Sequence, residues 1–382
     1  MVPYGNFYYF YVLMLVLAPA VVQGLLGIRI KWYGVAVSAY MIHVIFDGNG
    51  RELIFFIFFF AFEILMIYVF GWIFKKTRKR YVLWIALLLA LAPLACAKLS
   101  GTPVLPTAIG FLGISYLTFK ILQVLIQLYD RSIEMPRFYN LIYFILFFPT
   151  LSAGPIDRSA RFFEDADRKL TRKEYIGLLG DGLFRIAQGV GYKFIIAYLL
   201  QTFWLNNIPP HSTSLLQNIS YMYAYSLYLF FDFAGYSLIA VGVSNLLGIQ
   251  TPRNFNLPFL SRDIKEFWNR WHMTLSFWFR DFVYNRFVMA ALKNKWFKSK
   301  YAASYLGFLL TMTAMGLWHG LTVYYILYGA YHGCLIVATD WLEKRKLHRK
   351  LKTKKAFGIV SVLITFNLIC FGFYIFSGYS FN

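Results

Sequence analysis

Charged residues are scarce in this 382-residue sequence. Asp, Glu, Lys and Arg make up 14% of it, whereas an ordinary soluble domain contains about 25%. Hydrophobic residues make up 59%, and the mean hydropathy is +0.55. These values exclude an ordinary soluble globular protein. They predict an all-α polytopic membrane protein.

Acidic residues are rarer than basic ones: 17 Asp and Glu stand against 38 Lys and Arg, giving a net charge of +21. No stretch resembles a nucleic-acid-binding module, so we expect no nucleic-acid partner. Basic loops that face the anionic cytosolic leaflet account for the excess, and membrane lipid is therefore an expected contact. A basic cytosolic face would also attract an acidic soluble protein.

Several chemical motifs are missing as well. The three cysteines have no Cys-x-x-Cys spacing, which argues against a disulfide framework. There is no His-Glu-x-x-His sequence and no short histidine spacing on one helix, so no metal is expected. The absence of Gly-x-Ser-x-Gly argues against a serine nucleophile. We expect no bound cofactor.

Apolar runs long enough to enter or cross a bilayer fill most of the chain. They lie at about 7–26, 33–47, 53–74, 81–98, 107–128, 139–153, 176–203, 216–248, 302–321, 323–342 and 356–378. The basic stretches 75–80 and 344–355 predict cytosolic loops, which places the N-terminus outside the cell. No soluble domain fits between the runs, so we expect one integral membrane domain over residues 1–382.

Ionisable side chains interrupt this apolar pattern at Phe267–Asp281. A helix over 267–282 would place Trp268, His272 and Ser276 on one face. Such a helix is too polar to face lipid, so it should be buried in protein or line a water-filled cavity. We interpret its polar residues, and a lone carboxylate in an apolar run, as ion-pairing or tunnel-lining groups: Asn269, Arg270, Ser276, Arg280, Asp281 and Asp232. Asp232 is expected to pair with an internal arginine.

His319 lies in a second apolar segment, between Gly316 and Gly320. The glycines predict close backbone approach and room for a substrate beside the ring. Imidazole titrates near neutral pH and is the usual general base there. Two histidines, His272 and His319, on separate elements therefore indicate proton-transfer chemistry in a membrane cavity. For His332 we favour a packing role.

Six segments together resemble the membrane-bound O-acyltransferase family, in the family's order along the chain. They are Phe111–Phe119, Phe148–Pro155, Asp232–Tyr236, Asn254–Pro258, Trp268–Asp281 and Leu317–Gly320. The resemblance implies a ring of about 11 transmembrane helices around a thin core, with a funnel leading to the site. It also implies that His319 is the main catalytic histidine and that His272 supports it.

The block from Trp268 to Tyr284 is most similar to family members that transfer D-alanine to lipoteichoic acid in Gram-positive bacteria. This implies a donor thioester on the phosphopantetheine arm of an acidic cytosolic carrier protein. It also implies lipoteichoic acid, or an intermediate acyl acceptor, and other proteins of the D-alanylation system. An alginate-type polysaccharide O-acetyltransferase, or a precursor transporter with a histidine proton relay, remains an alternative.

The stretch Phe287–Lys300 follows directly on the first histidine block and combines apolar with basic residues. Val288 and Met289 lie next to Lys293 and Lys295. An apolar anchor with a basic rim suits a small acidic protein. We therefore expect the carrier to dock here.

Overall fold

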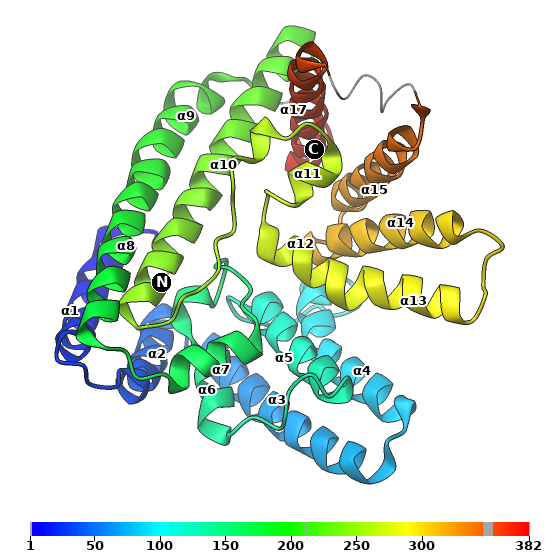
Figure 1. Cartoon of the computed structure of the whole chain (residues 1–382). Coiled ribbons are helices and arrows are strands. Elements are labelled where there is room, and N and C mark those ends of the chain that lie inside the picture. Colours follow the sequence, from blue (N-terminus) through cyan, green and yellow to red (C-terminus); the bar gives the residue numbers. More distant parts are fainter. Residues whose placement is uncertain (1, 108, 211–212, 347–353, 382) are drawn as a thin grey trace. The chain divides into compact units, whose positions relative to one another are not determined.

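The computed structural model describes residues 2–107, 109–210, 213–346 and 354–381, and its regular elements are helices (Figure 1). The chain forms two compact units. Unit 1 comprises Met1–Gly189 and Tyr236–Pro252, and unit 2 comprises Val190–Gly235 and Arg253–Asn382. Part of the basic stretch 344–355, expected to be cytosolic, lies outside the described residues.

Unit 1 is built from apolar helices that follow one another closely in sequence. They are α1 (Phe7–Leu25), α2 (Lys31–Ile45), α3 (Gly50–Thr77), α4 (Arg80–Leu99), α5 (Ile114–Tyr129), α6 (Phe138–Leu146), α7 (Ser159–Asp167), α8 (Arg172–Val190) and the last part of α10 (Leu215–Leu246). Asn6 caps α1, since its side chain accepts a 2.8 Å hydrogen bond from the Tyr9 amide. The most deeply buried of these helices is α5.

Unit 2 contains the two predicted histidine segments. Its elements are the π-helix η2 (Gly191–Ala197), α9 (Tyr198–Phe203), the first part of α10, α11 (Ile264–Trp268), α12 (Met273–Phe279), the π-helix η5 (Arg280–Tyr284), α13 (Asn285–Lys293), α14 (Lys300–His319), α15 (Val323–Glu343) and α17 (Lys355–Ser377). Both π-helices carry charged residues, Lys193 in η2 and Arg280 and Asp281 in η5.

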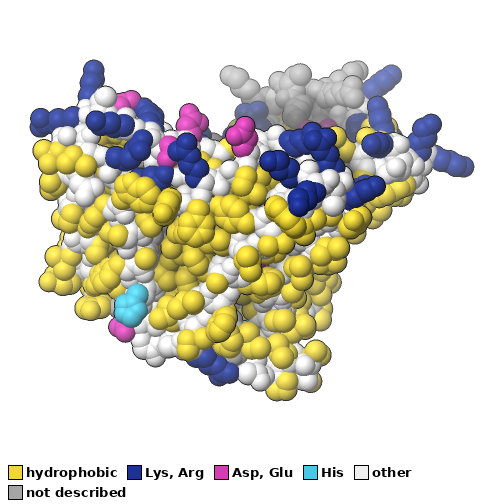
Figure 2. All heavy atoms as spheres, turned by 90° about the horizontal axis from the view of Figure 1, so that it is seen from below, with side chains coloured by type: hydrophobic (Ala, Val, Ile, Leu, Met, Phe, Trp, Pro, Cys, Tyr) yellow, Lys and Arg dark blue, Asp and Glu magenta, His cyan; other side chains and the backbone are white. Residues whose placement is uncertain are grey.

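Six helical segments in the described part of the chain are long and apolar enough to cross a membrane. They are Phe7–Leu25, Gly50–Thr77, Arg80–Leu99, Arg172–Asn207, Leu215–Leu246 and Ala356–Ser377. Helices α2, α5 and α6 are shorter, and α14 and α15 fall outside this set. Figure 2 shows hydrophobic side chains covering most of one face, with Lys and Arg gathered at its rim. The multi-pass membrane class is confirmed, while the predicted ring and funnel stay a prediction.

Glycine sets the packing of α14 against α15. A Cβ atom at Gly316 would lie 2.3 Å from the Tyr325 carbonyl oxygen, and one at Gly329 would lie 2.4 Å from the Met312 carbonyl oxygen. The two backbones therefore touch where only hydrogen atoms fit. At Gly320 the Tyr325 ring fills the same space. The expectation that these glycines leave room for a substrate was wrong, because α15 occupies that room.

Candidate active site

The segment 267–282 is not one helix. Helix α11 ends at Trp268, and α12 begins at Met273 after a turn in which His272 adopts a left-handed φ of +40°. The connection before it holds this turn, because Asn256 N donates to Arg270 O (2.9 Å) and Met273 N donates to Asn254 O (2.9 Å). The predicted shared face of Trp268 and His272 was therefore wrong.

His272 is buried, with only 3% of its surface exposed. Its Nδ1 lies 3.1 Å from Oδ1 of Asn254, and the Phe233 ring meets the imidazole edge-on at 4.8 Å. Burial lowers the pKa of His272 well below its ordinary value, and the charge of His319 lowers it further. His272 is therefore neutral at neutral pH, and the two imidazoles lie within electrostatic reach of each other.

His319 is the last residue of α14 and is half-buried. Aromatic rings surround its imidazole: the ring centres of Trp318 and Phe376 lie 4.6 Å and 5.0 Å away, and those of Tyr325 and Tyr328 about one ångström further. His332, by contrast, is fully buried in edge contacts with Trp268 and Tyr328, as expected of a packing residue.

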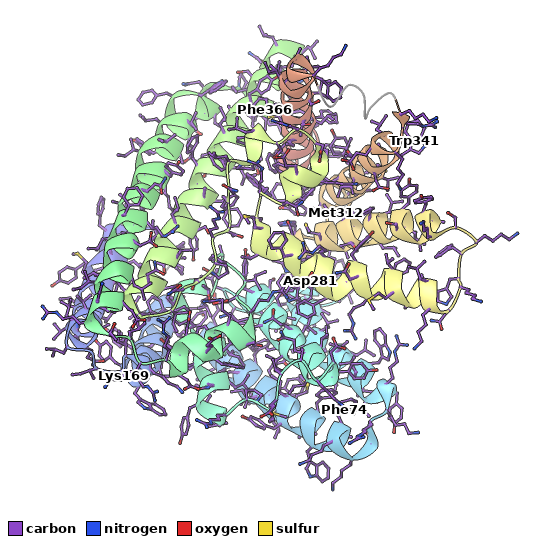
Figure 3. The ribbon with its side chains drawn as sticks, in the orientation of Figure 1. Phe74, Lys169, Asp281, Met312, Trp341 and Phe366 are labelled. Atoms are coloured by element: carbon purple, nitrogen blue, oxygen red, sulfur yellow. The ribbon has the colours of Figure 1, made fainter. Side chains whose placement is uncertain are left out.

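A cavity of about 280 Å³ lies in unit 2. It is lined by Lys265, Trp268, Asn269, Ser276, Phe277, Phe279, Arg280, Tyr284, Asn285, Phe308, Thr311, Met312, Met315 and Ile336. Figure 3 labels Met312 on α14 and Asp281 at the end of α12. Three of the predicted tunnel residues, Asn269, Ser276 and Arg280, thus line a real cavity.

The cavity extends along α14 toward His319. Thr311 and Met315 both line it, and His319 follows at the same four-residue spacing, which keeps all three on one helix face. His319 is one turn, about 6 Å, beyond Met315. Two buried polar atoms of the lining, Trp268 Nε1 and Thr311 Oγ1, have no hydrogen-bond partner among the described residues.

The charged residues near the site do not form the expected internal network. Arg270 pairs with Glu266 at 2.6 Å, one turn earlier on its own segment. Arg280 pairs with the adjacent Asp281 at 2.9 Å, and that pair is largely exposed. These residues form separate local pairs because the turn at His272 breaks the helix that would have aligned them.

Asp232 pairs with Lys193 of η2 and not with an arginine, so that expectation was wrong as well. Sequence reasoning missed Lys193, which lies inside an apolar run, and it did not single out Asn254, Thr311 or Trp268. The lone cation of Lys193 in that run was the one available signal.

The predicted docking residues lie on and after α13. Met289 is 70% exposed, and Lys293 and Lys295 are exposed too. Val288 instead faces α14, since its Cγ2 lies 3.0 Å from where a Gly307 Cβ would be. Trp296, at 54% exposed, extends the apolar surface in the place that Val288 was expected to fill.

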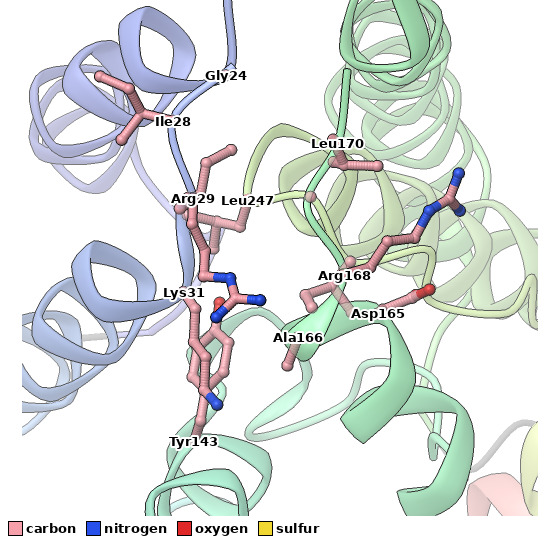
Figure 4. Close-up of a pocket in the computed structure, with 13 residues that line it drawn as sticks. Gly24, Ile28, Arg29, Lys31, Tyr143, Asp165, Ala166, Arg168, Leu170 and Leu247 are labelled. Carbon is pink, nitrogen blue, oxygen red and sulfur yellow. The ribbon is translucent and has the colours of Figure 1, made fainter. Parts of the chain in front are cut away.

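A second cavity, in unit 1, is too small for a substrate. Its volume is about 20 Å³, room for roughly one water molecule (Figure 4). Lys31 at its edge is held by Asn140 and by Asp167 at 2.6 Å, and Arg29 donates to the Asp167 carbonyl oxygen. Its cations are therefore already used in binding α6 and α7.

A multi-pass membrane protein with two neighbouring imidazoles and an adjacent cavity is equipped for proton transfer on a substrate held at the membrane. Residues 51–382 match the membrane-bound O-acyltransferase (MBOAT) family, and the chain belongs to that family. Two kinds of relative accompany this match.

The chain is similar to the teichoic acid D-alanyltransferase of Bacillus subtilis (strain 168), with 42% identity covering 100% of this chain and 99% of the relative. The enzyme of that name from Lacticaseibacillus rhamnosus is 39% identical over 99% of this chain and 97% of its own. The probable alginate O-acetylase AlgI of Pseudomonas syringae pv. tomato is 34% identical over 69% of this chain and 48% of its own.

Proposed function

We propose that this chain is a teichoic acid D-alanyltransferase. It takes D-alanine from a thioester on the phosphopantetheine arm of an acidic cytosolic carrier and delivers it to a hydroxyl of lipoteichoic acid or of an intermediate acceptor. The observation that carries the proposal is a half-buried His319 at the end of a cavity-lining helix face, in a chain that aligns over its whole length with enzymes of that name.

His319 acts as the general base in this proposal. The acceptor oxygen attacks the thioester carbonyl carbon while the imidazole takes its proton. The carbon–sulfur bond then breaks, an ester forms, and the proton passes to the leaving sulfur. The aromatic rings around His319 support this assignment, because they exclude water that would otherwise hydrolyse the thioester.

The cavity in unit 2 receives the thioester arm. Its lining is mainly apolar, which suits a long aliphatic chain, and the two unpartnered atoms Trp268 Nε1 and Thr311 Oγ1 suit the amides along that chain. From Met315 the thioester needs one further helical turn to reach His319. The tunnel role expected of Asn269, Ser276 and Arg280 is part of this proposal.

The carrier docks on α13 and the turn that follows it. Met289, Leu292 and Trp296 offer exposed apolar surface, and Lys293, Lys295, Lys298 and Lys300 supply the basic rim. Apolar burial provides affinity here and charge accelerates encounter. The cytosolic orientation of this face and the outside position of the N-terminus belong to the same proposal.

Polysaccharide O-acetylation is the weaker candidate. The alginate O-acetylase relatives align with 69% of this chain, and the chain spans about half of their length. A precursor transporter with a histidine relay would leave the similarity to O-acyltransferases unexplained.

The decisive experiment replaces His319. In vesicles supplied with D-alanyl carrier and lipoteichoic acid, His319→Ala should lose ester formation while expression and membrane insertion persist. His272→Ala should lose as much or less. His43→Ala changes an exposed histidine of unit 1 and serves as the control that keeps activity. Normal ester formation by His319→Ala would overturn the catalytic assignment.

Docking is tested with Met289→Asp, because Val288→Asp would also disturb the packing on Gly307. The new carboxylate should abolish carrier capture in a pull-down at low and at moderate salt. Asn294→Asp adds the same charge at an exposed polar position and should weaken capture less. If Met289→Asp captures carrier as well as the unmodified protein, these lysines contact only anionic lipid.

A further inference from the structure

The Asn254 side chain is the centre of a buried hydrogen-bond cluster in unit 2. Its Oδ1 lies 3.2 Å from the Thr274 amide nitrogen, 2.8 Å from the Thr274 hydroxyl and 3.1 Å from His272 Nδ1. Asn254 itself is 2% exposed. Three groups from the start of α12 therefore meet a single oxygen.

These contacts fix which atom of the amide points at α12. A backbone N–H can only donate, so the atom that meets the Thr274 amide must be the oxygen of Asn254. An amide oxygen can only accept, so His272 Nδ1 must carry a hydrogen and donate it. In a neutral imidazole the lone pair then resides on Nε2.

We propose that Asn254 is the positioning residue that fixes His272 as its neutral Nδ1–H tautomer, so that Nε2 accepts a hydrogen bond from the substrate. This inference rests on the proposed function and names the role of His272 within it. A neutral histidine held this way cannot donate through Nε2 to a developing oxyanion. It can hold an O–H or N–H group, which the acceptor hydroxyl and the D-alanyl ammonium both provide.

The choice of an amide over a carboxylate at position 254 supports this role. An aspartate would satisfy all three donors with no polar atom left over. The asparagine instead leaves a buried Nδ2 without a hydrogen-bond partner in the described part of the chain. What the amide provides in exchange is neutrality, because a carboxylate beside Nδ1–H would favour the imidazolium and remove the Nε2 lone pair.

The electrostatic surroundings act in the same direction. Burial and the charge of His319 both lower the pKa of His272. The other described groups packed against the ring, Phe233, Asn254 and Thr274, carry no charge. The left-handed backbone of His272 is uncommon for a residue other than glycine, and the bonds of residues 254–256 to 270–273 hold it in place.

The test compares the pH dependence of D-alanyl transfer in two variants. Asn254→Asp keeps the acceptor and adds charge, so it should transfer at high pH, with the acidic limb of the rate profile moved up by about one pH unit or more. Asn254→Ala should lose on the order of 10- to 100-fold at every pH, as when the orienting partner of a metal-bound histidine is removed. Asn256→Asp, two residues on, should leave the profile in place.

A structural role alone predicts a different result: both Asn254 variants would lose rate equally and keep the acidic limb of the unmodified protein. That outcome, or full activity in Asn254→Ala, would overturn the inference. Loss of activity in His319→Ala tests the proposed function separately. The unmodified protein provides a check that needs no Asn254 variant. Nitrogen NMR, assigned by the signal lost in His272→Gln, should show His272 protonated at Nδ1, and an Nε2–H signal would refute the lock.

A carrier loaded with propionate, which lacks the ammonium, identifies the group that Nε2 accepts from. If His272→Phe slows D-alanyl transfer but not propionyl transfer, Nε2 holds the ammonium. If both slow alike, it holds the acceptor hydroxyl. If neither slows, Nε2 holds no substrate group and the inference fails.

Discussion

The contact between α14 and α15 makes Gly316→Ala the sharpest test of how packing serves the site. The new methyl carbon would lie 2.3 Å from the Tyr325 carbonyl oxygen, whereas ordinary contacts begin at 3.4 Å. The helices must therefore separate by about 1 Å, and overpacking of this kind costs about 1–3 kcal/mol. Because His319 follows three residues later, its ring moves relative to the cavity, and a 1 Å misplacement can slow a reaction by about 100-fold.

The assay measures D-alanyl ester formed in vesicles and the melting temperature in detergent. We expect Gly316→Ala to melt earlier and to lose most of its rate, with a smaller effect on carrier capture. Gly180→Ala is the matched control, because no atom lies within 4 Å of its Cβ position on α8 and alanine favours helix by up to about 1 kcal/mol. A Gly316→Ala protein with the melting temperature and rate of the unmodified one would show that the two backbones are not in contact.

Three further substitutions test other parts of unit 2. Thr311→Val removes a buried hydroxyl without a described partner, so melting should be unchanged or later by about 1 kcal/mol, while transfer should slow if that hydroxyl meets the arm; faster transfer would remove Thr311 from the arm's path. Asp281→Asn and Arg280→Gln break a largely exposed pair, so each should cost at most about 1 kcal/mol in a melting experiment, and inactivity with normal melting would assign the residue to the chemistry. Burial raises the pKa of Asp340, but hydrogen bonds from Lys265 and Lys344 outweigh this and hold it below its ordinary value, so the ion pair stabilises the fold above that ordinary pKa and is lost as pH falls through the lowered one. The melting difference between Lys265→Met and the unmodified protein should therefore stay constant from about pH 5 to 9 and shrink toward pH 3, and a difference that does not change with acid would refute the assignment.

The apolar runs and the two histidines could be predicted because their signals are local. A run of some 20 apolar residues has few structural solutions, and six of the expected runs coincide with candidate spans. An imidazole in an apolar segment is costly wherever the segment lies, so His319 and His272 indicated chemistry before their contacts were known.

The turn at His272 could not be predicted in this way. Local periodicity favours a continuous helix through 267–282, and the bonds that break it come from Asn254 and Asn256, 14 to 19 residues away in sequence. The pairing of Lys193 with Asp232 is longer in range still. Val288 was misplaced for a related reason, since neither its residue type nor its neighbours reveal the glycine of α14 on which it packs.

The π-helix η5 joins α12 to α13 with one residue more per turn than an α-helix would use. Deleting any one residue between Arg280 and Tyr284 would let the segment relax into a regular helix and rotate everything after it by about 100°. Val288 would then leave Gly307, and Met289 would leave the exposed side of α13. The count of residues in this segment, more than their identity, should therefore be what natural variation preserves, since an insertion or deletion there changes which face α13 offers to a partner.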